Sequence, residues 1–412
     1  IIKLSVAAAL AATAMNAAVV DNVKLGGNAK LFYETNDSGT ASMFDNHAAT
    51  KGQVIVNVKA SASIGPITAN VRNATITTLG LENGVIGGTQ VNQSADGGTA
   101  NFTDIANLSA TIGQTTLIAG KQELNTPMCF TEGWNVHRNT FEAGVLVTKN
   151  LIPGSTVVFA DVKTTNASGA NIHNEGAFDT PINAEMAAIH TNVAGLPVNW
   201  YYYDVGTTSV NWVDTAFTVA GAKVKVIAAE RDEVVNNGSA QAISVATKVA
   251  GLNVFAAYST VSNDGVNFMN VATTKKTKLP TQAVYVDGTV VAQANTDAFK
   301  IKLSGMSVGP VKLAAQYVSA DQGTANDNET DIIAKTKIGN VDFKALLMFV
   351  DKETTSDDCT KFRVYANLEV GTVDKSFTDI IVTRDLAGAK LALSAGEWNS
   401  RKSMGAKISV KF

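Results

Sequence analysis

The chain contains few charged residues, few prolines and only two cysteines. Charged residues make up 17% of its 412 residues, against about 25% in an average soluble domain, and the formal net charge is −3. Nucleic-acid-binding proteins carry a basic patch or stripe, so this balance argues against a nucleic-acid partner. Two cysteines can form neither a disulfide scaffold nor a zinc site with four thiolates. Hydrophobic residues make up 45% of the chain, which excludes a disordered protein.

Long apolar runs are also missing after the first residues. The longest later run, Ala345–Val350, has six residues, whereas a membrane helix needs about 18. At the start, Lys3 precedes an alanine-rich apolar stretch and a series of small residues. This order is typical of a secretory signal peptide, although a short buried helix would give a similar pattern. We therefore expect residues 1–18 to be the signal and residues 19–412 to be the mature domain.

Most of the remaining chain alternates between apolar and polar residues. In the last ten residues, every second side chain from Met404 to Phe412 is apolar and every other one is small or polar. A period of two places these two sets on opposite faces of a β-strand. The same alternation recurs in residues 54–60, 141–147, 222–228, 311–317, 341–349 and 362–370.

The connections between these segments are of two kinds. Short glycine-containing turns, such as Ile64–Ile67 and Val308–Val311, join some pairs of strands. Short turns at one end and long polar loops at the other are typical of an outer-membrane barrel. We predict an all-β fold, a transmembrane antiparallel β-barrel of about 18 strands (16–20) with short periplasmic turns and long extracellular loops. The long polar connections are residues 35–52, 79–103, 166–183, 262–295 and 351–361.

Two neighbouring segments resemble a known family. Residues 120–128 (GKQELNTPM) and 138–143 (RNTFEA) are similar to the Opr-type porins, the major outer membrane proteins of epsilonproteobacteria. The resemblance implies a passive diffusion channel for small hydrophilic solutes and ions in the bacterial outer membrane, a homotrimer without cofactor or catalysis. Its partners would be the lipid bilayer, lipopolysaccharide and the outer-membrane assembly machinery. Aromatic residues are fewer than a barrel's girdles suggest, at 7%, and the best girdle candidates are Trp200–Tyr203 and Trp398.

The third long loop, residues 121–140, is the one that folds inward in general porins. Its charged residues and those beside it are therefore candidates for the pore constriction. Two of them, Arg138 and Glu142, could instead anchor the base of the loop by hydrogen bonds. The constriction candidates are Lys121, Glu123, Glu132, His137, Arg138 and Glu142, with Pro127, Cys129 and Trp134 also in the loop.

Basic residues are concentrated on one face of the predicted strands. If the apolar residues face lipid, the opposite face carries most of the lysines. Lys59 and Arg72 are equally distant from the Gly65–Pro66 turn, so we expect them to be cross-strand neighbours. A basic lumen wall would favour small anions, unless these residues only line a wide periplasmic vestibule. The four representative wall residues are Lys59, Arg72, Lys223 and Lys225.

The last residue, Phe412, ends an alternating strand in phase with its apolar face. A terminal aromatic in this position is the signal that outer-membrane assembly machinery generally reads, so we interpret Phe412 as the assembly signal. We expect this last strand to close the barrel by pairing with the first one.

Signals for catalysis or metal binding are weak. Gly305–Gly309 matches a nucleophile motif, but it falls in a predicted hairpin and no histidine follows it. The four histidines are scattered, so we expect no enzyme, no cofactor and no metal site. Residues 327–331 could bind Ca²⁺ or form a solvated loop. Cys129 and Cys359 could form a disulfide, but the sequence does not decide whether they do. The alternative function is a surface-exposed adhesin or layer protein, which a conductance measurement would distinguish from a porin.

Overall fold

A computed structural model describes residues 21–37, 42–91, 99–168, 171–172, 177–354, 358–374, 380–386, 389–398 and 401–410. The predicted signal, residues 1–18, and the predicted assembly signal, Phe412, lie outside these described residues. In the described part of the chain, no helix is both long enough and apolar enough to cross a membrane.

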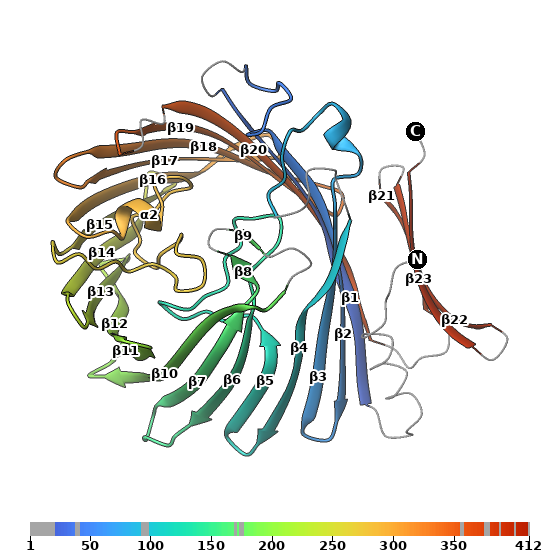
Figure 1. Cartoon of the computed structure of the whole chain (residues 1–412), viewed down its shortest axis with the longest axis horizontal. Helices are drawn as coiled ribbons and strands as arrows, with labels where there is room; N and C mark the ends of the chain where they lie inside the picture. Colours follow the sequence, from blue (N-terminus) through green and yellow to red (C-terminus); the bar gives the residue numbers. More distant parts are fainter. Residues whose placement is uncertain are drawn as a thin grey trace.

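Eighteen antiparallel strands form one closed sheet (Figure 1). Strands that follow one another in the chain pair with each other, and β1 closes the ring by pairing with both β2 and β20. Because the sheet is closed, none of its described strands has an edge with unpaired backbone N–H and C=O groups. A sheet in lipid needs this closure, since lipid offers these groups no hydrogen-bond partner. The predicted barrel of about 18 strands is confirmed. The strands are β1 (Asp21–Asn36), β2 (Lys51–Ile64), β3 (Ile67–Thr77), β4 (Ala100–Ile112), β5 (Thr115–Gln122), β6 (Phe141–Lys149), β7 (Thr156–Thr165), β10 (Thr180–Val193), β11 (Leu196–Val205), β12 (Thr208–Val219), β13 (Ala222–Glu233), β14 (Asn237–Val249), β15 (Leu252–Val261), β16 (Thr296–Val308), β17 (Val311–Asp321), β18 (Asn326–Ile338), β19 (Val341–Lys352) and β20 (Cys359–Asp374).

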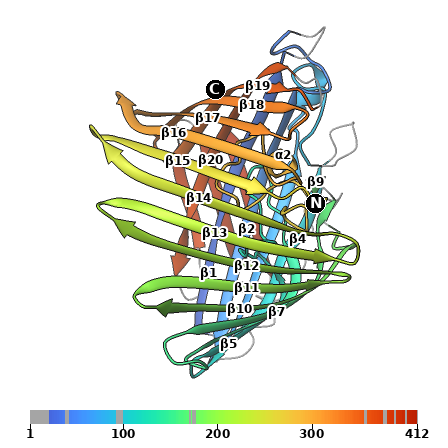
Figure 2. The same ribbon diagram turned by 90° about the vertical axis from the view of Figure 1, so that its left-hand side faces the viewer.

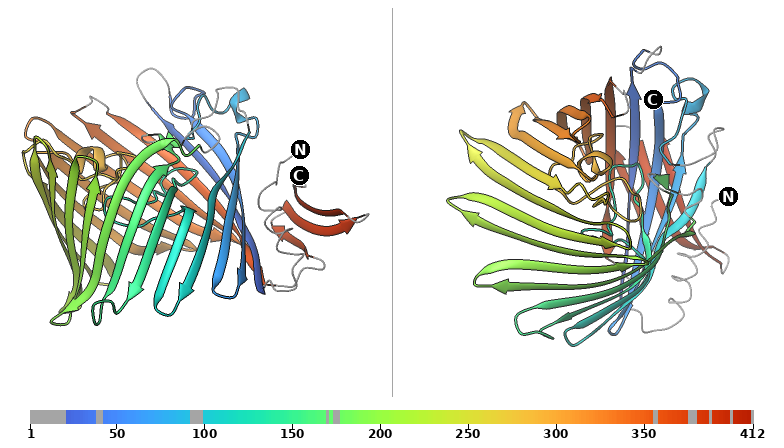
Figure 3. Two further views of the ribbon diagram at one scale, coloured as in Figure 1. Left: turned by 60° about the horizontal axis from the view of Figure 1, so that its bottom comes forward. Right: turned by 60° about the vertical axis from the view of Figure 1, so that its left-hand side comes forward.

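Small elements lie in the connections. A two-stranded hairpin, β8 (Ala167–Ser168) and β9 (Asn171–Ile172), follows β7. The helical turns are η1 (Leu81–Asn83) and α2 (Gly288–Val291). They belong to the loops at the end of the barrel opposite the tight hairpin turns (Figure 3). At those tight turns Gly65, Gly309 and Gly339 have positive φ angles of 54°, 56° and 59°, which glycine adopts without strain.

The long loops are unevenly distributed around the barrel. Residues 78–99, 123–140 and 262–295 form long connections, but β11 and β12 are joined by residues 206–207 alone. Residues 234–236 and 322–325 are similarly short connections at the same end of the barrel. Figure 2 shows the strands that these short connections join, β11 to β14, β17 and β18. The predicted pattern of long loops therefore holds for only part of the rim.

The prediction for the closing strand was wrong. The last strands, β21 (Ile380–Leu386), β22 (Ala389–Trp398) and β23 (Arg401–Val410), form a separate three-stranded sheet. β1 pairs instead with β20, in a register that runs from Lys24–Asp374 to Asn36–Lys361. Alternation identifies a strand and its two faces, but it does not identify the partner strand, and β20 alternates as regularly as β23.

The predicted girdle residues Trp200–Tyr203 do not all lie on one face of β11, and Trp398 lies in β22, outside the barrel sheet. Trp200 and Tyr202 of β11 stack on each other with ring centroids 6.5 Å apart, and Tyr201 and Tyr203 form a second stack at 6.4 Å. Tyr203 is 1% exposed and its hydroxyl accepts a hydrogen bond from the Met128 backbone, inside the barrel. Four consecutive strand residues cannot all face lipid, because their side chains alternate between faces.

The structure bears on two alternatives that the sequence left open. Residues 327–331 belong to β18, where Asp327, Glu329 and Asp331 are buried, so the solvated-loop interpretation was wrong. Cys129 and Cys359 are not joined by a disulfide.

Candidate functional site

Two long loops lie inside the barrel, and we call them L3 (residues 123–140) and L7 (residues 262–295). L3 contacts the wall formed by β1 and β20: the Tyr365 hydroxyl donates to the Trp134 carbonyl at 2.6 Å, and the Lys30 ammonium donates to the Asn135 carbonyl. L7 contacts the wall at β15, where the Ser259 and Thr281 hydroxyls are 2.6 Å apart, and at β20, where Arg363 donates to the Tyr285 hydroxyl at 3.0 Å. Both loops therefore narrow the lumen, and both are bonded to the barrel wall.

The two loops are joined to each other. The Asn270 side chain of L7 accepts a hydrogen bond from the Phe130 N–H at 3.3 Å and donates one to the Phe130 carbonyl at 2.8 Å. The Val271 N–H donates to the Met128 carbonyl, also at 2.8 Å. Bonds from L7 to the L3 backbone make the loops one assembly across the lumen.

Glu132 of L3 is the charged centre of this junction. It is 5% exposed. Its Oε1 accepts hydrogen bonds from Asn270 Nδ2, at 2.8 Å, and from the Thr273 hydroxyl. Its Oε2 accepts a hydrogen bond from the Trp134 indole at 2.5 Å. A buried carboxylate is tolerated when its oxygens are satisfied in this way.

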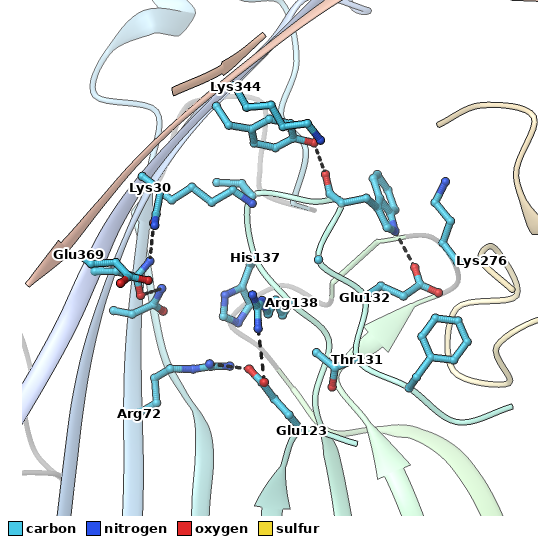
Figure 4. A pocket seen from close by; sticks show the side chains of 18 of the residues that line it. Lys30, Arg72, Glu123, Thr131, Glu132, His137, Arg138, Lys276, Lys344 and Glu369 are labelled. Atoms are coloured by element: carbon cyan, nitrogen blue, oxygen red, sulfur yellow. Dashed lines mark hydrogen bonds and ion pairs between the residues drawn. The ribbon is translucent and has the colours of Figure 1, made fainter. Parts of the chain in front are cut away.

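L3, L7 and the wall enclose a cavity of about 1390 Å³. Figure 4 shows Lys30, Arg72, Arg138 and Lys344 around it. Three acidic residues line the cavity, namely Glu123, Glu132 and Glu369, against a much larger basic set. The cavity is therefore strongly basic, although the whole chain is slightly acidic. The basic lining residues are Lys24, Lys30, Lys59, Arg72, Arg138, Lys276, Lys278, Lys300, Lys302, Lys344 and Arg363.

The base of L3 is held by a compact charge cluster. The Arg72 guanidinium donates to both oxygens of Asp104 through Nε, at 2.9 and 3.0 Å, and to Glu123 through Nη1 at 2.7 Å. Arg138 reaches the other Glu123 oxygen at 3.5 Å. The His137 ring nitrogen is 3.0 Å from Asp104. Arg72 and Asp104 are buried, so these bonds act in a medium of low dielectric constant and fix the loop base to β3 and β4.

Burial changes the protonation of several loop residues. It lowers the pKa of His137 below the usual 6.5, although Asp104 opposes the shift, so His137 is neutral at pH 7. Burial also lowers the pKa of Lys276, against the attraction of Asp287. The pKa of the Cys129 thiol is raised by burial, so this cysteine is unreactive.

The structure places four of the six constriction candidates at the cavity: Glu123, Glu132, His137 and Arg138. The other two are elsewhere. Lys121 and Glu142 are directly opposite each other on β5 and β6, on the face that points away from the lumen. Phe141 and Ala143, the neighbours of Glu142, are buried against the inside of the barrel, and alternation turns Glu142 outward. For these two residues the expected position at the pore is wrong.

The four basic wall residues divide into two pairs. Lys59 and Arg72 are cross-strand partners on β2 and β3, as expected, and both line the cavity. Lys223 and Lys225 are on β13, across the barrel in Figure 1. Lys225 is 3.9 Å from Asp214 of β12, which partly neutralises it.

Some residues of the site were missed from the sequence. Lys344 alternates with apolar residues in β19, so its place on the lumen face could have been read from the period of two. The expected loop of residues 79–103 overlaps β4, which begins at Ala100, and Asp104 of this strand was not singled out. Lys276 and Lys278 lie in L7, where only the folded loop brings them to the cavity.

Comparisons with known proteins identify the fold. No protein-family model matches the sequence, and no curated protein matches it. OccAB1 of Acinetobacter baumannii is similar in structure, with a TM-score of 0.68, 11% identity and coverage of 84% of this chain and 96% of that one. OpdK of Pseudomonas aeruginosa with vanillate has a TM-score of 0.67 and 8% identity, and the match covers 85% of this chain and 99% of that one. A BenF-like porin from Pseudomonas fluorescens Pf-5 has a TM-score of 0.65 and 9% identity, and the match covers 84% of this chain and 98% of that one. The chain thus has the 18-stranded barrel fold of outer-membrane porins of the Occ and BenF-like kinds.

Proposed function

We propose that this protein is a porin of the bacterial outer membrane, a water-filled channel through which small hydrophilic solutes diffuse passively. The observation that carries the proposal is the polar cavity inside a closed 18-stranded barrel, narrowed by L3 and L7. A barrel of this size leaves an aqueous lumen when loops do not fill it completely. The function needs no catalytic group.

The direct test is single-channel recording of the purified protein in a planar bilayer. A porin gives discrete, long-lived conductance steps that grow with salt concentration. A protein that binds lipid but gives no steps would refute the channel and favour the adhesin.

We further propose that the channel prefers small anions, including carboxylates. The basic residues around the cavity raise the local concentration of anions, and their field extends about 10 Å at 0.1 M salt. Aromatic rings lie beside several of these cations: the Lys30 and Lys344 ammonium groups are 4.8 and 5.4 Å from the centre of the Tyr365 ring. OpdK, which was solved with vanillate, gives a precedent for an aromatic carboxylate in this fold.

The reversal potential in a KCl gradient tests this preference. We expect anion selectivity at low salt that fades at high salt and decreases in a Lys302→Ala, Lys344→Ala double variant. The matched control is the Lys223→Ala, Lys225→Ala double variant, which removes two lysines from outside the cavity lining. Cation selectivity of the unmodified protein at low salt would contradict the proposal.

We also propose the family, the oligomeric state and the partners of the protein. The likeness of residues 120–128 and 138–143 to the Opr-type porins of epsilonproteobacteria supports membership of that family, a homotrimer and contact with lipopolysaccharide. Migration of unheated protein as a trimer on a denaturing gel would support the assembly. Phe412 remains the proposed signal for the assembly machinery, and its deletion should reduce the amount of folded protein in outer-membrane fractions.

A further inference from the structure

Three carboxylates follow one another along the inner face of β18. Asp327, Glu329 and Asp331 are each at most 1% exposed. Burying a carboxylate is costly unless hydrogen bonds replace its water. Glu329 meets this condition through L7: its oxygens accept hydrogen bonds from the backbone N–H groups of Val284, Tyr285 and Val286 at 3.2, 2.8 and 2.6 Å.

Three successive N–H groups that converge on one carboxylate form an anion-binding concavity of backbone. Bonds to an ionised acceptor are stronger than neutral ones. The same segment is also held from its other side, where the Lys276 ammonium donates to the Val284 carbonyl at 2.7 Å and to Asp287 at 3.0 Å. Residues 284–287 are therefore fixed between the barrel wall and the rest of L7.

This segment adjoins the part of L7 that borders the cavity. Lys276, Gln282 and Val284 line the cavity itself. Lys276 also faces L3, with its ammonium group 5.8 Å from the centre of the Trp134 ring. A change in the position of residues 284–286 would thus move the cavity-lining side of L7 and disturb its contact with L3.

We infer that Glu329 is a positioning residue, which fixes L7 to the barrel wall and so sets the width of the channel. The inference rests on the proposed channel function. Glu329 does not itself line the cavity; it acts through the backbone of L7.

The strand provides a matched control for this role. Asp327 is as buried as Glu329 and lies two residues away on the same face, but it accepts hydrogen bonds from the Thr354 N–H at 3.1 Å and the Thr354 hydroxyl at 2.6 Å. Thr354 belongs to the connection between β19 and β20. Asp327→Asn therefore removes a buried negative charge from the same strand without touching L7.

The experiment compares Glu329→Gln with Asp327→Asn in the full-length protein. For Glu329→Gln we expect a single-channel conductance about 1.5-fold higher, with more open-channel noise, because a looser loop blocks the pore less. Trypsin should also cleave after Lys275, Lys276 or Lys278 about tenfold faster, because local opening exposes L7. Asp327→Asn should leave both measurements as in the unmodified protein. Equal effects of the two substitutions, or no effect of either, would overturn the inference.

Two further measurements keep the test decisive. If Glu329→Gln does not fold, amide hydrogen exchange in the unmodified protein tests the inference instead. Unprotected exchange of the Val284, Tyr285 and Val286 amides would overturn the inference that Glu329 fixes L7. If the unmodified protein gives no conductance steps, the proposed channel fails, but the proteolysis comparison still decides whether Glu329 holds L7.

Discussion

Glu132→Gln should loosen the junction between L3 and L7 while the barrel stays intact. Glutamine keeps the volume of the side chain and can leave its oxygen facing Asn270 and Thr273. Its amide nitrogen then replaces the oxygen that accepts the Trp134 indole N–H, so two donors face each other at a position where the native distance is 2.5 Å. A lost hydrogen bond to a charged group costs about 1.5–3 kcal/mol, and the unsatisfied buried donor adds to this.

The structure therefore predicts a loss of about 2–3 kcal/mol in the free energy that closes the junction, because the Trp134 bond is lost and the Asn270 and Thr273 bonds become neutral. Such a loss corresponds to about 30- to 150-fold faster amide exchange by local opening. The amide to follow is that of Val271, which donates to the Met128 carbonyl across the junction. Hydrogen exchange of the detergent-solubilised protein, followed by mass spectrometry, measures it directly.

The control for this experiment is Asp342→Asn. Asp342 pairs with Lys337 at 3.5 Å on the other end of the barrel, and both side chains are more than half exposed, so this ion pair contributes little. Exchange at Val271 should be unchanged in the control. If Glu132→Gln also leaves it unchanged, the carboxylate is not what joins the two loops, and the reasoning from its three bonds is refuted.

Three further predictions follow from the wall and the loop base. His137 has a lowered pKa in the folded protein, so below about pH 6.5 the unfolded chain binds a proton that the folded one does not, and stability falls by up to about 1.4 kcal/mol per pH unit. His137→Gln should flatten this dependence between pH 7 and pH 5 in thermal melts, and a parallel profile would contradict the assignment. Lys121→Ala should leave conductance and selectivity unchanged, because Lys121 faces away from the lumen; an altered reversal potential would place it at the pore. Gly120→Ala should destabilise the barrel by about 1–3 kcal/mol, because Gly120 has a φ of 116° and a Cβ atom would lie 2.3 Å from the Ala106 carbonyl oxygen. Unfolding on heating in gel electrophoresis measures this loss, and an unchanged transition would contradict it.

The alternation of apolar and polar residues predicted the barrel, because a strand with lipid on one face and water on the other needs this alternation along its whole length. It also gave the cross-strand pair of Lys59 and Arg72, since a tight turn fixes the register of the two strands that it joins. It could not give the position of Lys121 and Glu142 without a decision on which face of each strand is inside. Consecutive residues of a sequence motif lie on both faces of a strand. The constriction candidates that were taken from one motif therefore included residues of the lumen face and of the outer face.

Loops set the limit of what the sequence could predict. Glu132 was expected to touch solutes, but the structure uses its charge to bind Asn270 and Thr273, more than 130 residues away. Glu329 was assigned to a loop because its segment is rich in Asp and Asn, whereas it is a strand residue that binds a loop. Contacts of this kind depend on how two irregular segments pack, and no periodicity encodes them.

The seam between β1 and β20 has a consequence for the way in which the barrel folds. The bond across it from Asn28 Nδ2 to Asn367 Oδ1, at 3.2 Å, joins residues 339 positions apart in the chain. Such distant pairing is slow, and until β20 arrives β1 keeps one unpaired edge that can pair with other chains. We therefore predict that the edge of β1 has to be shielded until the chain as far as Asp374 is available for pairing. Chains truncated before β20 should aggregate or be degraded rather than accumulate as narrower barrels.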